Sequence, residues 1–138
     1  MIDKTLDKSV PFITLFELKK NYNSYIIFDT REKKEYETSH LKNAINISYT
    51  KFYIDEFTKK INENKTIVVY CSIGYRSEKI GKQLLSKGYK VYNLYGGIFN
   101  WINQNQEVFD MNNCITQKIH CYNKKWGNWL IKGEKIYD

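Results

Sequence analysis

The chain has 138 residues, of which 42% are apolar and 27% charged, and this is the size and composition of one ordinary globular domain. The formal net charge of +7 is spread over scattered lysines without any nucleic-acid-binding motif, so we interpret it as a solvated basic surface and expect no nucleic-acid partner. No apolar stretch is long enough to cross a bilayer and residues 1–8 lack the apolar core of a signal peptide, so we expect a cytoplasmic protein without a membrane partner.

Short apolar runs alternate with amphipathic segments along most of the chain, which predicts alternating strands and helices. In chain order we expect a strand over residues 10–14, a helix over 15–22, a strand over 25–28, a helix over 33–38, a strand over 44–47, a helix over 52–61, a strand over 66–70, a helix that begins at an N-cap Ser77 and ends before Gly88, a strand over 91–95, and a helix over 98–102. This alternation predicts an α/β fold, with a central, mainly parallel sheet flanked by helices in three layers.

The chain after Val108 has a different character, and we divide the protein into a domain over residues 1–107 and an extension over 108–138. Trp126, Trp129 and Leu130 have helical spacing, which favours a C-terminal helical extension that packs on the same domain. A docking surface for a partner is the alternative interpretation of these aromatic residues.

Cys71 ends the most strand-like segment and precedes a loop, Ser72 to Ser77, that continues into a helix. A thiol in this position lies near several backbone N–H groups and the positive end of a helix dipole, and both favour the thiolate. Arg76 adds a permanent positive charge to the same loop. In parallel sheets, sites lie at the carboxyl ends of the strands, where Asp29 and Arg31 also fall.

The three cysteines, Cys71, Cys114 and Cys121, are an odd number, which favours reduced thiols over a disulfide framework. The chain has no CxxC pair and two histidines, so we expect neither a metal site nor another cofactor.

Four blocks in order resemble the single-domain rhodanese-type sulfurtransferases. They are Phe28-Asp-Thr-Arg31, Ser39-His-Leu-Lys-Asn-Ala44, Val69-Tyr-Cys-Ser-Ile-Gly-Tyr-Arg-Ser77 and Leu94-Tyr-Gly-Gly-Ile-Phe-Asn-Trp101. The resemblance implies the rhodanese-like fold and a Cys71 persulfide that carries sulfane sulfur. A small anionic donor such as thiosulfate, a polysulfide or a persulfide would supply the sulfur, and a thiol, cyanide or a protein would accept it.

The length of the loop discriminates among relatives of this fold. Four residues separate Cys71 from Arg76, whereas the related phosphatases and arsenate reductases place five there to enclose a tetrahedral oxyanion. Sulfur transfer is therefore the preferred function. The alternatives are a non-enzymatic persulfide carrier or redox-sensing module and, below these, a cysteine-dependent phosphatase or arsenate reductase.

The resemblance also implies roles for the other site residues. Ser72, Ile73 and Tyr75 should line the rim of the loop and contribute backbone amides, and Gly74 should permit a conformation that a side chain would block. We expect Arg76 to contact a bound anion, with bracing of the loop as its alternative role, and Ser77 to cap the helix. Three supporting residues complete the site: Asp29 and Arg31 as a structural pair, with direct contact to substrate as their alternative role, and His40 as a structural hydrogen-bonding residue in a turn.

Overall fold

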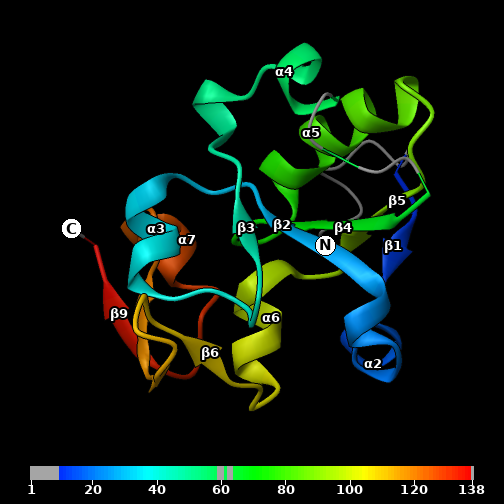
Figure 1. Ribbon diagram of the computed structural model, residues 1–138. Helices are drawn as coiled ribbons and strands as arrows, with labels where there is room; N and C mark the ends of the chain where they lie inside the picture. Colours follow the sequence, from blue (N-terminus) through cyan, green and yellow to red (C-terminus); the bar gives the residue numbers. More distant parts are fainter. Residues whose placement is uncertain (1–9, 59–60, 62–63, 138) are drawn as a thin grey trace.

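The computed structural model of the protein describes residues 10–58, 61 and 64–137, and its central element is a parallel sheet (Figure 1). The sheet has five strands in the order β1-β5-β4-β2-β3, and every neighbouring pair in it is parallel. The strands are β1 (Phe12–Ile13), β2 (Tyr25–Asp29), β3 (Ile45–Asn46), β4 (Thr66–Tyr70) and β5 (Val91–Leu94). The predicted mainly parallel sheet is thus confirmed.

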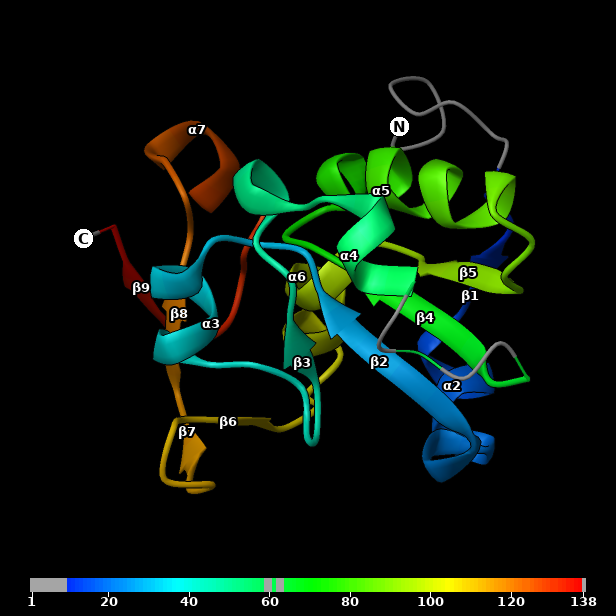
Figure 2. The ribbon, with the colours of Figure 1, turned by 45° about the horizontal axis from the view of Figure 1, so that its top comes forward.

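Helices cover both faces of this sheet and complete the three layers. They are α2 (Leu15–Lys20), α3 (Lys33–Thr38), α4 (Ile54–Thr58), α5 (Tyr75–Ser86) and α6 (Gly97–Asn103), with short 3₁₀ turns η1 (Tyr22–Ser24) and η2 (Tyr49–Lys51). Figure 1 shows α4 and α5 above the sheet and α2 and α6 below it, and Figure 2 shows α4 and α5 together again on their side of the sheet. Successive side chains of β4 point to opposite faces of the sheet, as this arrangement requires. Ile67 and Val69 belong to one core cluster, and Val68 and Tyr70 belong to the other.

Local signals explain where several helices begin and end. Thr14 and Glu17 form a reciprocal capping box at the start of α2, and α5 ends before Gly88, whose φ of +93° suits glycine. The predicted helix over 33–38 has the same bounds as α3. The helix predicted over 52–61 begins at Ile54, and residues 59 and 60 of that prediction lie outside the described residues.

The extension differs from its prediction, because no continuous C-terminal helix forms through Trp126, Trp129 and Leu130. The segment instead contains β6 (Val108–Phe109), β7 (Ile115–Thr116), β8 (Lys118–His120), the four-residue α7 (Lys124–Gly127) and β9 (Glu134–Ile136). Positive φ angles at Tyr122 and Gly133 turn the chain on either side of α7 and prevent a continuous helix. β8 and β9 pair in parallel, and Figure 2 shows this pair beside α3.

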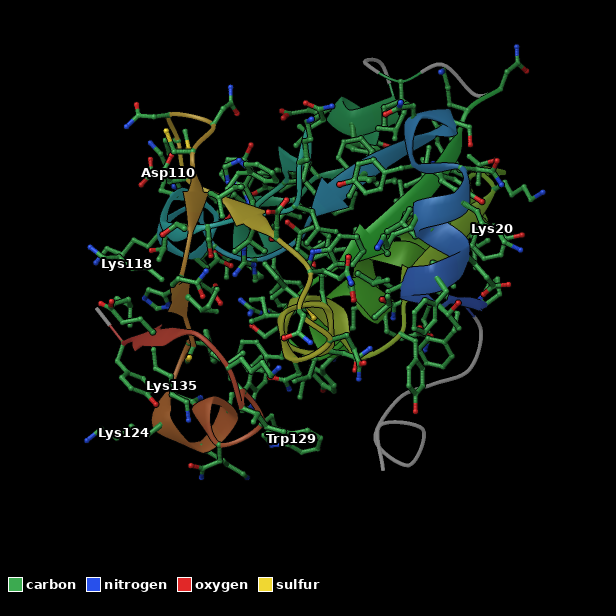
Figure 3. All side chains as sticks on the ribbon, turned by 90° about the horizontal axis from the view of Figure 1, so that it is seen from below. Lys20, Asp110, Lys118, Lys124, Trp129 and Lys135 are labelled. Atoms are coloured by element: carbon green, nitrogen blue, oxygen red, sulfur yellow. The ribbon has the colours of Figure 1, made fainter. Side chains whose placement is uncertain are left out.

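The extension nevertheless shares the core of the domain. Ile119, Cys121 and Leu130 are buried in the same apolar cluster as the residues of α2 and α6. Figure 3 shows Lys118 and Lys124 reaching outward from the far side of the extension, which agrees with the expected solvated basic surface. Within the described residues, no helix is long and apolar enough to span a membrane.

Candidate active site

The segment of residues 71–77, here called the active-site loop, leaves the carboxyl end of β4 and includes the first turn of α5. The first turn of α6 holds the beginning of this loop, because Ile98 N donates to Cys71 O at 2.9 Å and Phe99 N donates to Ser72 O at 3.2 Å. Gly97 permits this close approach, since a Cβ there would lie 2.5 Å from both carbonyl oxygens and its φ is +62°. Gly97, the first residue of α6, therefore has a specific use, which is to let this helix approach and anchor the backbone of the cysteine.

One backbone amide of the loop donates to the sulfur of Cys71, and one hydroxyl oxygen lies near it. Gly74 N donates to Cys71 Sγ at 3.0 Å, and Ser77 Oγ lies 3.5 Å from the same sulfur. Gly74 has a φ of +113°, so the prediction of a special conformation at this glycine is confirmed. α5 begins directly afterwards at Tyr75, and the N–H groups of its first turn have no partners within the helix. An anionic sulfur here is therefore close to positive partial charge.

The predicted role of Ser77 as the N-cap is wrong. The left-handed conformation at Gly74 starts the helix three residues earlier, so Gly74 is the N-cap residue and Ser77 lies inside the first turn. Its hydroxyl instead donates to Asn93 Oδ1 on β5 at 2.7 Å. Asn93 Nδ2 donates in turn to Gly74 O at 3.1 Å, which ties the loop to the neighbouring strand. Sequence reasoning did not identify Asn93 as a site residue, although a polar side chain in an otherwise apolar strand is a signal that could have done so.

Arg76 forms a buried ion pair with Glu35 of α3 rather than pointing to an open anion site. Its Nη1 and Nη2 each lie 2.8 Å from a carboxylate oxygen of Glu35, and Nη2 also donates to Ser72 Oγ at 3.1 Å. Burial raises the pKa of Glu35, but the hydrogen bonds and charge of Arg76 outweigh it and hold the pKa below its ordinary value. Of the two roles considered for Arg76, the geometry fits bracing of the loop and not the preferred contact with substrate.

The neighbouring strand end contains a second buried network. The guanidinium of Arg31 donates to both oxygens of Asp29, with Nη2 to Oδ2 at 2.7 Å, and also to Ser39 O at 2.6 Å. Tyr70 OH donates to Asp29 Oδ2 at 2.8 Å, and burial together with the charge of Asp29 raises the pKa of Tyr70 well above its ordinary value. The protonated phenol thus completes the Asp29–Arg31 pair that the sequence predicts as structural.

His40 lies in a turn where its bonds are structural. Its ring stacks on Tyr36 with centroids 4.1 Å apart, and Nδ1 lies 2.8 Å from Tyr36 O. The backbone of His40 exchanges two hydrogen bonds with Phe109 at 2.9 Å each, which attaches this turn to β6. The geometry agrees with the predicted supporting role.

The Cys71 side chain is closed off from solvent, whereas part of the loop that follows it is exposed. Cys71 is fully buried, Ile73 is half-buried, and Tyr75 is exposed with Lys79 Nζ 5.0 Å from its ring centroid. The two remaining cysteines are also free thiols, Cys114 exposed and Cys121 buried. Burial raises the pKa of the Cys121 thiol. Among the described residues, no group of three His, Cys, Asp or Glu side chains has the arrangement of a metal site.

Comparison with known families matches the rhodanese-like domain to residues 14–104 of this chain. The thiosulfate sulfurtransferase GlpE of Coxiella burnetii is 33% identical over 95 residues, which cover 68% of this chain and 86% of that protein. The tRNA uridine(34) hydroxylase of Cytophaga hutchinsonii is 32% identical over 102 residues, covering 69% of this chain and 32% of that protein.

The fold has solved counterparts as well. The crystal structure of a rhodanese-related protein from Thermoplasma volcanium superimposes with a TM-score of 0.65 at 28% sequence identity, covering 71% of this chain and 96% of that one. The family match includes the whole parallel sheet except its first strand, and the complete loop that surrounds Cys71. On this ground the chain belongs to the rhodanese-like domain family.

Proposed function

We propose that this protein is a sulfurtransferase that carries sulfane sulfur as a persulfide on Cys71. The observation that carries the proposal is the contact between the Cys71 sulfur and the Gly74 amide, 3.0 Å long, at the start of α5. A persulfide ends in an anionic sulfur, and the amides of a helix N-terminus stabilise such a charge without a metal.

The first half-reaction transfers one sulfur atom from the donor. With thiosulfate, the Cys71 thiolate attacks the outer sulfur, a new sulfur–sulfur bond forms, and sulfite leaves with the electron pair of the bond that breaks. In the second half-reaction, cyanide or a thiolate attacks the terminal sulfur of the persulfide. Thiocyanate or a new persulfide leaves, and the Cys71 thiolate is regenerated with all charges balanced.

Two features support sulfur transfer over phosphoryl chemistry. The active-site loop has four residues between Cys71 and Arg76, and both terminal nitrogens of Arg76 are committed to Glu35. Phosphoryl transfer needs positive groups that face the transferred oxyanion. The ion pair with Glu35 removes the Arg76 guanidinium from that role.

The test is steady-state formation of thiocyanate from thiosulfate and cyanide, repeated with a polysulfide donor and a thiol acceptor. We expect turnover in the wild type and none in Cys71→Ser, with Cys114→Ser as the matched control that retains it. Stoichiometric loading without turnover for any acceptor would instead identify a persulfide carrier. Cys71-dependent hydrolysis of an aryl phosphate at a higher rate than sulfur transfer would refute the proposal.

A further inference from the structure

Two aromatic rings of the extension lie against the guanidinium of Arg76. The Cζ atom of Arg76 is 4.6 Å from the ring centroid of Tyr122 and 5.3 Å from that of Trp126. The two rings also contact each other, with centroids 4.8 Å apart. Both residues lie outside residues 14–104, the range that matches the family. The extension therefore contributes contacts to the active-site loop that the family core does not contain.

The backbone that presents these rings is held in an uncommon conformation. Tyr122 has a φ of +70°, in the left-handed region that non-glycine residues with large side chains rarely adopt. Tyr122 N donates to His120 Nδ1 at 3.1 Å, and Trp126 N donates to Asn123 Oδ1 at 2.8 Å as the cap of α7. Strained residues of this kind persist where the surrounding contacts fix them, and they concentrate at functional sites.

The faces of the two rings provide favourable electrostatic contacts for the buried guanidinium of Arg76. Arg76 Nε is buried and has no hydrogen-bond partner among the residues that the structure describes, although the other two nitrogens bond to Glu35 and Ser72. The negative face of an aromatic ring attracts a guanidinium, most strongly where water is excluded. Rings placed here also reduce the access of water to the ion pair with Glu35, which strengthens its attraction.

We propose that Tyr122 and Trp126 are positioning residues of the active site, which act on Cys71 through Arg76. The rings hold the guanidinium in place, and the guanidinium holds Ser72 Oγ, one residue after the reactive cysteine. Loss of the ring faces leaves Arg76 less ordered, and the loop then departs more often from the geometry that directs the Gly74 amide at the sulfur. The proposal rests on Cys71 as the reactive group of the proposed sulfurtransferase.

Leucine and phenylalanine substitutions separate the ring face from simple filling of space. Tyr122→Leu and Trp126→Leu keep apolar bulk without an aromatic face, whereas Tyr122→Phe and Trp126→Phe keep the face. Trp129→Leu is the matched control, because Trp129 lies on the same extension as an exposed side chain (Figure 3). Tyr122→Gly removes the ring but suits the positive φ, so this variant keeps its thermal unfolding midpoint close to that of the wild type.

The measurements are the rate of alkylation of Cys71 by iodoacetamide and the kcat and KM of sulfur transfer. We expect the double leucine variant and Tyr122→Gly to lose about ten-fold in alkylation rate and kcat, with KM nearly unchanged. The phenylalanine variants and Trp129→Leu should stay within about two-fold of the wild type.

Wild-type rates in Tyr122→Gly and in the leucine variants would overturn the proposal, as would equal losses in the phenylalanine and leucine series. The alkylation rate does not depend on sulfur transfer. A wild type that reacts with iodoacetamide but transfers no sulfur would therefore refute the proposed function, while the comparison among variants would still decide the role of the rings.

Discussion

Replacement of Glu35 by glutamine removes the charge that pairs with Arg76 and preserves the size of the side chain. The carboxylate of Glu35 accepts three hydrogen bonds, two from Arg76 at 2.8 Å and one from the backbone N of Glu32 at 2.9 Å. Both members of the ion pair are almost fully buried. Loss of one partner leaves the other charge buried and uncompensated, at a cost of about 3–5 kcal/mol. The amide oxygen of glutamine still accepts hydrogen bonds, so we expect Glu35→Gln to lower the free energy of unfolding by about 3 kcal/mol, at the low end of this range.

Urea unfolding followed by tryptophan fluorescence measures this loss, and Glu37→Gln on the same helix is the matched control. Glu37 pairs with Lys33 at 3.8 Å on the surface, where such a pair contributes less than about 0.5 kcal/mol. The reasoning is refuted if Glu35→Gln loses no more free energy of unfolding than Glu37→Gln at neutral pH.

The acid dependence of the same variant has a defined sign. Because the pKa of Glu35 in the folded protein lies below its ordinary value of 4.5, its ionised form stabilises the fold at higher pH. This contribution is fully present well above pH 4.5 and is lost as the pH falls through the lower, folded-state pKa. The free-energy difference between the wild type and Glu35→Gln should therefore shrink on acidification, and a difference that grows would contradict the ion pair.

Two further predictions concern the loop and its access. Gly97→Ala places a methyl group 2.5 Å from the carbonyl oxygens of Cys71 and Ser72. We therefore expect the free energy of unfolding, measured in urea, to fall by about 2–4 kcal/mol. Gly88→Ala, where nothing lies within 4 Å, should lose about 1–2 kcal/mol from its positive φ alone, and equal losses would contradict the close approach. Because Cys71 is buried and Cys114 is exposed, a bulky maleimide should modify Cys114 well before Cys71, as peptide mapping can show. Equal rates at the two cysteines would contradict the restricted access.

The main elements of the fold can be predicted from local patterns. The run of β-branched residues that forms β4 and the helix at 33–38 appear in the structure with the predicted bounds. The expected loop around Cys71 is also confirmed, because Gly74 has a positive φ and its amide contacts the sulfur. These features depend on residues close together in the chain, and a local pattern specifies them.

Contacts between distant residues were beyond this kind of prediction. In the sequence, Glu35 has the pattern of an exposed charge on a polar helix. Its burial depends on an ion pair with Arg76, 41 residues later in the chain. The helical spacing of Trp126 and Trp129 predicts a helix, but a left-handed residue at 122 and the pairing of β8 with β9 determine the actual path. Periodicity carries no information on either of these constraints.

The mass of the intact protein after incubation with thiosulfate or polysulfide tests the central claim most directly. If the Gly74 amide and the start of α5 stabilise an anionic terminal sulfur on Cys71, the wild type, Cys114→Ser and Cys121→Ser each gain the mass of one sulfur atom, and a reducing thiol removes it. Cys71→Ser should gain none. Equal loading of all three single variants, or no loading of the wild type by any donor, would contradict the account.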